Sequence, residues 1–319
     1  RCGRSGEGSD RGRLNPQTPF ASFIDDLTSM DQEAARKPAE LSVGQCVTLA
    51  CLLEVTTTKP GNVHRAADFE DLGLLDFAVS SVAIEPAMSA AHHKGVGATV
   101  LAATRATRAL VPSNTNLGTI LLLAPLAAVP SELPLNEGLP GVLANLDSAD
   151  TIAFYEAIRL ASPGGLGTVD QMDVVGAPPL DLLVAMQHAV DRDLVARQYV
   201  NGFEQVFGLV APRIVAGCES GLSLTSAIID AHIFLMARHP DSLIARKCGA
   251  EVAMESSQRA ARVIDAGEPR SDAYGRAASD LDFWLRSDGH RRNPGTSADL
   301  IAAALYVALR EGSLRPPFR

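Results

Sequence analysis

Aromatic side chains are scarce in this sequence of 319 residues, and their scarcity limits the folds open to it. Only 5% of the residues are Phe, Trp or Tyr, although 46% are hydrophobic. The interior must therefore be filled mainly by Ala, Leu, Val and Ile, which suits close packing of helices better than a strand-rich sandwich. No alternating strand run matches the helical runs in quality. The composition predicts an all-α protein with a substantial core.

Cysteines are few, and long hydrophobic runs are missing. The five cysteines show no CxxC or Cys/His spacing, which is typical of reduced, buried thiols and predicts a cytoplasmic protein. The most apolar run, residues 117–129, is too short to cross a bilayer and contains Pro125. A formal net charge of -9 disfavours attraction to nucleic acid or to an anionic membrane, so we expect neither as a partner.

The sequence also lacks the common motifs of nucleotide binding and hydrolysis. It contains no GxxxxGKS/T phosphate loop, no GxGxxG at the start of a βαβ unit, no HExxH and no GxSxG. Residues 162–167 are glycine-rich, but without a lysine or a strand they indicate an ordinary loop. Any nucleotide site must therefore be built in another way.

Two parts of the chain differ in pattern. Residues 1–39 begin with a run rich in Arg, Gly, Ser and Asp, so we expect a disordered or weakly helical extension. From residue 40 to about residue 312, apolar residues recur at helical spacing between loops that carry Pro, Gly and Asn. No linker or internal repeat divides this part, so we predict one helical domain over residues 40–312.

Four polar runs lie where a predicted helix meets a turn. Such junctions place polar side chains on a rigid scaffold, where binding and catalytic sites are commonly found. A plain helical scaffold would not need all four. Their sequences are EVTTTKPGNVH at 54–64, PSNTNLG at 112–118, PDSLIARKCG at 240–249 and NPGTSADL at 293–300.

Together the four runs resemble those of the triphosphoribosyl-dephospho-CoA synthase family. Its members carry an EVxxxPKPG-type run, an NTxxG run, an aspartate-led run ending in basic residues and glycine, and a PGxSADLLA run. The match extends over most of residues 41–308. The resemblance implies a wholly helical fold and transfer of the triphosphoribosyl group of ATP to the ribose hydroxyl of 3′-dephospho-CoA, with release of adenine.

This implied reaction sets the needs of the site. Glycosyl transfer of this kind passes through an oxocarbenium-like state. The site then needs a carboxylate near the sugar, a base for the incoming hydroxyl and cations for the triphosphate, with Mg²⁺ expected alongside ATP.

The first run and the acidic stretch after it carry the catalytic candidates. Glu54 precedes the turn by about one helical turn, which makes it the candidate base, with a surface salt bridge as the alternative. Lys59 lies in the matching KPG motif and is assigned to phosphate, with Gly61, Asn62 and His64 beside it. Asp71 stands where the family has an aspartate. We expect it to be a catalytic carboxylate and Mg²⁺ ligand, unless it is only a charge at a helix N-terminus.

The other three runs are assigned to substrate binding. Helix starts offer amides, hydroxyls and backbone N–H groups to phosphate or hydroxyl oxygens, although the asparagines and aspartates here also fit ordinary helix caps. The basic pair in the third run would add positive charge. The full set is Asn114, Asn116, Gly118, Asp241, Arg246, Lys247, Gly295, Ser297 and Asp299.

Departures from the family pattern leave the acceptor and the activity open. Citrate-lyase-associated members often carry NTHKG and HRGG, whereas this chain has NTNLG at 114–118 and ARKCG at 245–249. These differences favour another acceptor as an alternative, for example a pterin or another nucleotide-like cofactor precursor. Two further classes remain. One is a metal-dependent helical glycohydrolase, in which water replaces the hydroxyl, and the other is a noncatalytic helical binding module.

Overall fold

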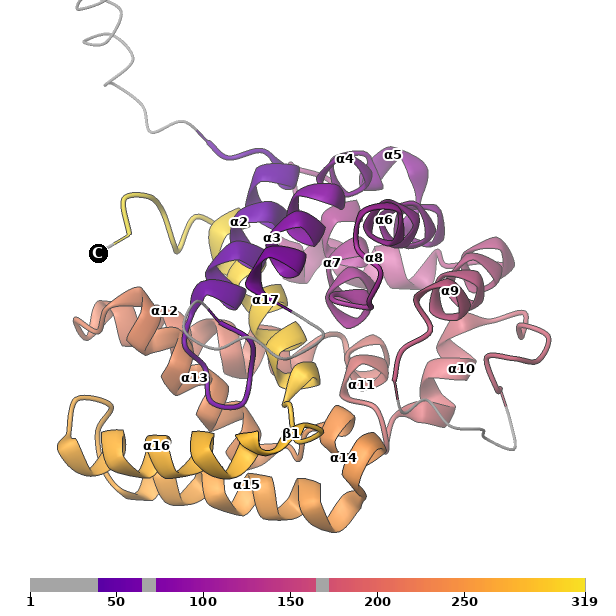
Figure 1. Ribbon diagram of the computed structural model, residues 1–319. Coiled ribbons are helices and arrows are strands. Elements are labelled where there is room, and N and C mark those ends of the chain that lie inside the picture. The colour runs from indigo at the N-terminus through magenta and orange to yellow at the C-terminus, as the bar shows by residue number, and fades with distance from the viewer. Residues whose placement is uncertain (1–39, 65–72, 165–171, 319) are drawn as a thin grey trace, which may run out of the picture. The chain divides into compact units, whose positions relative to one another are not determined.

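Helices dominate the computed structural model of the chain, which describes residues 40–64, 73–164 and 172–318. Figure 1 shows helix following helix along the described chain, so the predicted all-α class is confirmed. The one strand labelled within these ranges is β1 (Ser287–His290), of four residues. The weak helix expected near residues 20–37 lies outside the described residues.

From Leu41 onward the chain forms one unit of contacts. The elements before the middle of the chain are α2 (Val43–Thr56), α3 (Leu74–Ala83), α4 (Glu85–Ser89), α5 (Ala91–Lys94), α6 (Val96–Leu110), α7 (Leu117–Ala128), α8 (Leu135–Ala144) and α9 (Ser148–Ala161). Those after it are α10 (Leu182–Ala189), α11 (Leu194–Asn201), the π-helix η1 (Val206–Val210), α12 (Ala211–Glu219), α13 (Leu224–Arg238), α14 (Ser242–Cys248), α15 (Ala250–Asp265), α16 (Asp272–Arg286) and α17 (Gly295–Arg310).

Two buried helices form the centre of the core. α7 is apolar on all sides, and every residue from Thr119 to Ala128 is buried. α17 buries every residue from Leu300 to Leu309 and packs against α2, α7, η1, α12 and α13, in the middle of the view in Figure 1. A helix that is apolar all round must be covered on every side. The apolar run at 117–129 therefore belongs to the core, and only the polar first turns of these two helices are left for a site.

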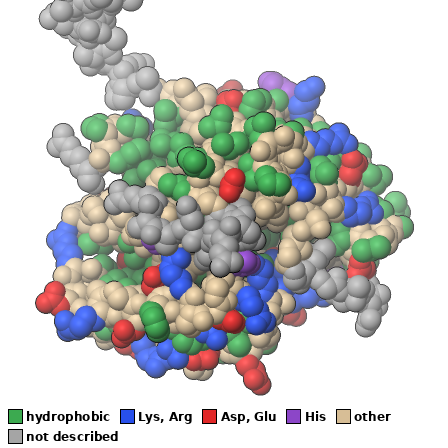
Figure 2. Space-filling model, viewed as in Figure 1, with side chains coloured by type: hydrophobic (Ala, Val, Ile, Leu, Met, Phe, Trp, Pro, Cys, Tyr) green, Lys and Arg blue, Asp and Glu red, His purple; other side chains and the backbone are tan. Residues whose placement is uncertain are grey.

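Two hydrophobic clusters share the core. The larger joins α2 to most helices through α13 and to α17, whereas the smaller holds α13 to α16 together through residues such as Ile233, Ile244 and Leu281. α15 and α16 run side by side at the bottom of Figure 1. On the face in Figure 2, Lys and Arg side chains, mixed with Asp and Glu, gather over this lower part.

No helix within residues 40–64, 73–164 and 172–318 combines the length and apolar character that crossing a bilayer requires.

Candidate active site

A cavity of about 750 Å³ lies where the four polar runs meet. This volume falls within the range of small-molecule sites, roughly 300–1,000 Å³. Five of the predicted residues are buried without lining it, namely Lys59, Gly61, His64, Asp241 and Ser297. The predicted residues on its wall are Glu54, Asn62, Asn114, Asn116, Gly118, Arg246, Lys247, Gly295 and Asp299.

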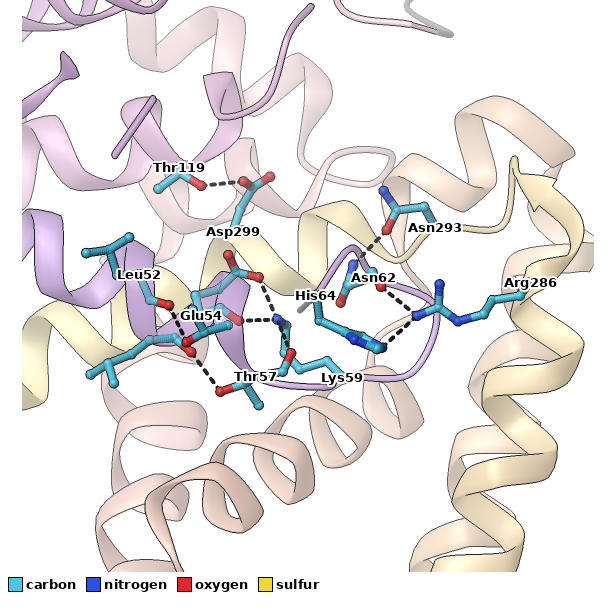
Figure 3. Close-up of polar contacts among 12 residues, drawn as sticks. Leu52, Glu54, Thr57, Lys59, Asn62, His64, Thr119, Arg286, Asn293 and Asp299 are labelled. Atoms are coloured by element: carbon cyan, nitrogen blue, oxygen red, sulfur yellow. Dashed lines mark hydrogen bonds and ion pairs between the residues drawn. The ribbon is translucent and has the colours of Figure 1, made fainter. Parts of the chain in front are cut away.

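Glu54 reaches the cavity wall from the last turn of α2, backed by a buried lysine. The ammonium of Lys59 lies 2.8 Å from Oε1 of Glu54 and also donates to the backbone carbonyl oxygens of Glu54 and Thr57 (Figure 3). The Lys59 side chain is 0% exposed. In this structure Lys59 therefore contacts Glu54 instead of the cavity, and its assignment to phosphate stays a prediction.

A neutral histidine flanks this ion pair. His232 of α13 is fully buried, and burial lowers the pKa of its imidazole to about 3, with the Lys59 charge acting in the same direction. His232 therefore adds no positive charge beside Glu54 at neutral pH.

The turn that contains Gly61 is clamped onto α16. The Gly61 N–H donates to Oδ1 of Asp282 at 2.7 Å, and Arg286 donates to the backbone oxygen of Asn62 at 2.6 Å. Nη2 of Arg286 also lies 3.1 Å from Nε2 of His64 (Figure 3). Gly61 has φ +76°, and a Cβ there would lie 2.9 Å from the Leu285 Cβ. Only glycine allows both this conformation and this close approach.

The two asparagines of the second run have different surroundings. Oδ1 of Asn114 accepts a hydrogen bond from the Leu117 N–H at 3.1 Å, so Asn114 has the cap role that its position permits. Asn116 is the residue before α7, yet its side chain makes no capping hydrogen bond, and its buried Nδ2 has no hydrogen-bond partner among the described residues. Because a buried amide without a partner is costly, Asn116 marks a place where a ligand atom fits.

Gly118 and Thr119 hold the carboxyl group of Asp299. The Thr119 hydroxyl donates to Oδ1 of Asp299 at 2.6 Å (Figure 3). A Cβ on Gly118 would lie 2.1 Å from Oδ2 of Asp299, so a side chain at position 118 would force the carboxyl group to move. Burial raises the pKa of Asp299 to about 8; the Thr119 hydrogen bond opposes this, and the Glu54 charge reinforces it. Asp299 is therefore mostly protonated at neutral pH.

Asp241 ties the third run to the fourth. Its Oδ1 accepts from the Leu243 and Ile244 N–H groups and so caps α14, while its Oδ2 accepts from the N–H and hydroxyl of Ser297 at 2.7 and 2.8 Å. The N-terminal turn of α17 thus already holds a carboxylate, which is the kind of group this position favours. Asp241 and Ser297 fix the direction of α17, and the phosphate contact predicted for Ser297 stays a prediction.

Several cations surround the cavity. Nη1 of Arg246 lies 2.8 Å from Oδ2 of Asp193, and the buried Nε of Arg246 has no hydrogen-bond partner in the part of the chain that the structure describes. Lys247 lines the same wall, and Arg108 and Arg192 line it from other elements. Such groups can bind phosphate oxygens.

Another part of the cavity wall is apolar. α9 contributes Ile158 and Ala161, and α10 contributes Leu182, Ala185 and Met186. We call the part of the wall made by the four runs the polar half and the part made by α9 and α10 the apolar half.

Comparison with known proteins decides the family. The sequence profile of the family described as ATP:dephospho-CoA triphosphoribosyl transferase matches residues 40–317. The chain belongs to this family. The family predicted from the four polar runs is confirmed.

Known relatives agree with this membership. A protein of Pseudomonas syringae pv. tomato, provisionally named 2-(5″-triphosphoribosyl)-3′-dephosphocoenzyme-A synthase, is 31% identical over 122 residues, which are 38% of this chain and 41% of the relative. One of Pseudomonas fluorescens with the same provisional name is 32% identical over 107 residues, which are 33% of this chain and 36% of the relative. These matches span less than half of either relative.

A solved structure shares the fold. It is a crystal structure from Archaeoglobus fulgidus, provisionally assigned as a triphosphoribosyl-dephospho-CoA synthase. It is 26% identical, with a TM-score of 0.57, and the alignment covers 74% of this chain and 99% of the other.

Asp71, which we predict as catalytic carboxylate and Mg²⁺ ligand of this transferase-family member, lies outside the described residues. Within the described ranges, no group of three or more His, Cys, Asp or Glu side chains is placed to hold a metal ion. A Mg²⁺ bound mainly through substrate phosphates needs only one or two protein carboxylates. The magnesium expectation therefore stays a prediction.

Sequence reasoning missed four residues that shape the site of this family member. Asp282 and Arg286 form an i,i+4 pair on α16, which in a sequence looks like any surface ion pair. Thr119 is a single polar residue in an apolar helical run, and such a residue gives no sign of a site in the sequence. Asn293, whose Oδ1 accepts from Nδ2 of Asn62 at 2.6 Å, is the first residue of the fourth run, and that position was the only signal.

Proposed function

We propose that this protein transfers the triphosphoribosyl group of ATP to the ribose hydroxyl of 3′-dephospho-CoA and releases adenine, in the biosynthesis of a prosthetic group. The observation that carries the proposal is the pair of carboxyl groups, Glu54 and Asp299, on the polar wall of one cavity. Family membership supplies the reaction, and this pair supports a chemistry for it.

The chemistry requires help at two points. An oxocarbenium-like sugar is stabilised by a nearby negative charge, and the attacking hydroxyl must lose a proton. Glu54, paired with the buried Lys59, is suited to both tasks as an oriented carboxylate. The proposed base is therefore Glu54.

Recognition of ATP is assigned to the rest of the polar half. The cations Arg246, Lys247, Arg108 and Arg192 suit a triphosphate, which carries several negative charges. The Nδ2 of Asn116, which no described residue contacts by a hydrogen bond, suits a sugar or phosphate oxygen, because an amide N–H₂ is a donor only. Mg²⁺ belongs to the proposal as the usual companion of a triphosphate, with Asp71 as its predicted ligand.

The apolar half supports the acceptor. 3′-Dephospho-CoA carries a long arm with methyl and methylene groups between its amides, and Ile158, Leu182 and Met186 offer these groups an apolar surface. Burying such an arm contributes affinity in proportion to the apolar area removed from water. A different acceptor is favoured by one feature: Asn116 and Leu117 stand on the wall where citrate-lyase-associated members carry His and Lys. A pterin or another cofactor precursor is the second candidate.

The test is acceptor-dependent release of adenine. Purified protein is incubated with ATP and Mg²⁺, with and without 3′-dephospho-CoA, and adenine is measured by chromatography. We expect release only with the acceptor, and a loss of roughly a hundredfold or more in Glu54→Gln. Glu156→Gln, on the exposed surface of α9, is the matched control and should keep full activity. Adenine release without an acceptor would indicate a glycohydrolase, and ATP binding without release would indicate another acceptor.

A further inference from the structure

We infer that Asp299 is a catalytic acid, which donates the proton to the departing adenine while Glu54 accepts the proton of the attacking hydroxyl. This assignment rests on the proposed function and adds a second reacting group to it. It gives the two carboxyl groups opposite roles at one sugar.

The two carboxyl groups differ in their hydrogen-bond partners. Glu54 has a cation as its partner, with Nζ of Lys59 at 2.8 Å, whereas Asp299 has a neutral hydroxyl, that of Thr119, at 2.6 Å. Oδ2 of Asp299 receives no hydrogen bond from the described residues; it packs against Gly118, and Asp299 lines the cavity. A carboxyl group placed in this way can keep its proton on Oδ2 and present it to a ligand.

The charged and titratable groups around Asp299 come from several helices. Glu54 and Cys51 face it from α2, and Asp241 and Arg246 face it from the start and the end of α14. Burial is the main cause that raises the pKa of Asp299; Glu54 and Asp241 add to it, and Arg246 opposes it. Burial also raises the pKa of the Cys51 thiol, which therefore remains neutral. Two carboxyl groups whose surroundings differ in this way are the usual basis of acid and base roles.

The proposed step balances in atoms and electrons. The acceptor hydroxyl oxygen forms a bond to C1′ of the ribose, and its proton passes to a carboxylate oxygen of Glu54. The bond from C1′ to the adenine nitrogen breaks, its electron pair stays on adenine, and the proton of Asp299 Oδ2 passes to a ring nitrogen of the base. Glu54 ends protonated and Asp299 ionised. Both are reset by proton exchange with water after the products leave.

A leaving-group experiment tests this role. The full chain with Asp299→Asn is assayed with ATP and with a ribosyl triphosphate that carries 4-nitrophenol at C1′, a group that departs as an anion without protonation. With ATP we expect a loss of roughly a hundredfold or more, the range for a missing general acid. With the nitrophenyl donor we expect activity within about tenfold of the unmodified protein. Asp280→Asn, on the exposed surface of α16, is the matched control.

Two outcomes would overturn the assignment. One is an equal loss on both donors, and the other is recovery of Asp299→Asn by excess Mg²⁺, which would indicate a metal ligand. Unmodified protein that releases no adenine from ATP would contradict the proposed function instead, so the two failures are distinguishable.

A second variant covers the case in which Asp299→Asn does not fold. In Thr119→Val the hydrogen bond that lowers the pKa of Asp299 is lost while the side-chain shape is kept. The alkaline limb of the kcat–pH profile should therefore move to higher pH. An unmoved limb in a folded Thr119→Val would contradict the acid role.

Discussion

The ammonium of Lys59 lies 2.8 Å from Oε1 of Glu54, and its side chain has no exposed surface. Lys59 belongs to the KPG motif, which is assigned to phosphate binding from the sequence. In the structure it contacts the proposed base instead, from the side away from the cavity. A lysine ammonium is tolerated at this depth only because its charge is paired and hydrogen-bonded. We infer that Lys59 is a positioning residue, which holds Glu54 as an oriented carboxylate at the cavity wall.

Replacement of Lys59 should show whether it positions Glu54 or binds the phosphates of ATP. Lys59→Met leaves Glu54 without its cation, so we expect a loss of roughly 3 kcal/mol of unfolding free energy and a fall in kcat, with little change in the KM for ATP. Thermal unfolding and steady-state kinetics measure these effects. Lys247→Met, on the cavity wall, is the comparison and should raise the KM for ATP. A large rise in the KM for ATP in Lys59→Met would restore the phosphate assignment.

Gly118 is expected to be intolerant of any side chain. In Gly118→Ala the new Cβ would lie 2.1 Å from Oδ2 of Asp299, so the carboxyl group must move. We predict a drop in kcat of roughly a hundredfold and a loss of about 1–3 kcal/mol of stability, measured by adenine release and by denaturant unfolding. Gly141→Ala in α8 is the control, because its Cβ would meet nothing within 4 Å. Normal kcat in Gly118→Ala would show that the position of Asp299 is unimportant.

The apolar half should control the acceptor without affecting ATP. Ala185 lines the cavity from α10, so Ala185→Phe fills part of the space proposed for the acceptor arm. We expect the KM for 3′-dephospho-CoA to rise about tenfold or more, equivalent to about 1.4 kcal/mol, while the Kd for ATP stays unchanged. Val184→Phe, whose side chain is exposed on the same helix, should leave both constants unchanged. If Ala185→Phe weakened ATP binding instead, the division of the cavity would be wrong.

Stability should depend on pH through Asp299. Its pKa is raised in the folded protein to about 8, from an ordinary value of 3.8, so its contribution to stability is present in full below the lower value. That contribution is lost as pH rises towards the higher value, at roughly 1 kcal/mol per pH unit, and the loss levels off above about 8. Asp299→Asn cannot ionise. Its unfolding free energy relative to the unmodified protein should therefore grow between pH 5 and 8, as thermal or urea unfolding measures. A constant difference across this range would show that Asp299 does not retain its proton in the folded state.

Local chemistry made part of this structure predictable. Apolar spacing indicates the helices, and the residue types at Asn114 and Asp241 indicate the caps that form there. These features depend on residues within a few positions of one another. The sequence alone could not tell that Asn114 is a cap and Asn116 is not, because the difference depends on side-chain geometry.

Contacts between distant segments were not predictable. Asp299 meets Thr119 across 180 positions, and Arg286 meets Asn62 across 224. Each pair forms because α17 packs against α7 and α16 is hydrogen-bonded to the turn that contains Gly61 and Asn62, and nothing in either local sequence specifies its partner. The burial of Lys59 has the same cause. Motif resemblance located the site, but packing decides which residues face the cavity.

The stoichiometry of adenine and acceptor tests the central claim most directly. Purified protein with ATP, Mg²⁺ and 3′-dephospho-CoA is followed by chromatography and mass spectrometry of both nucleotide products. We predict one adenine released for each acceptor consumed, with the acceptor's mass increased by one triphosphoribosyl group and with neither change in Glu54→Gln. Adenine released while 3′-dephospho-CoA stays unmodified, or a fully active Glu54→Gln, would contradict the account.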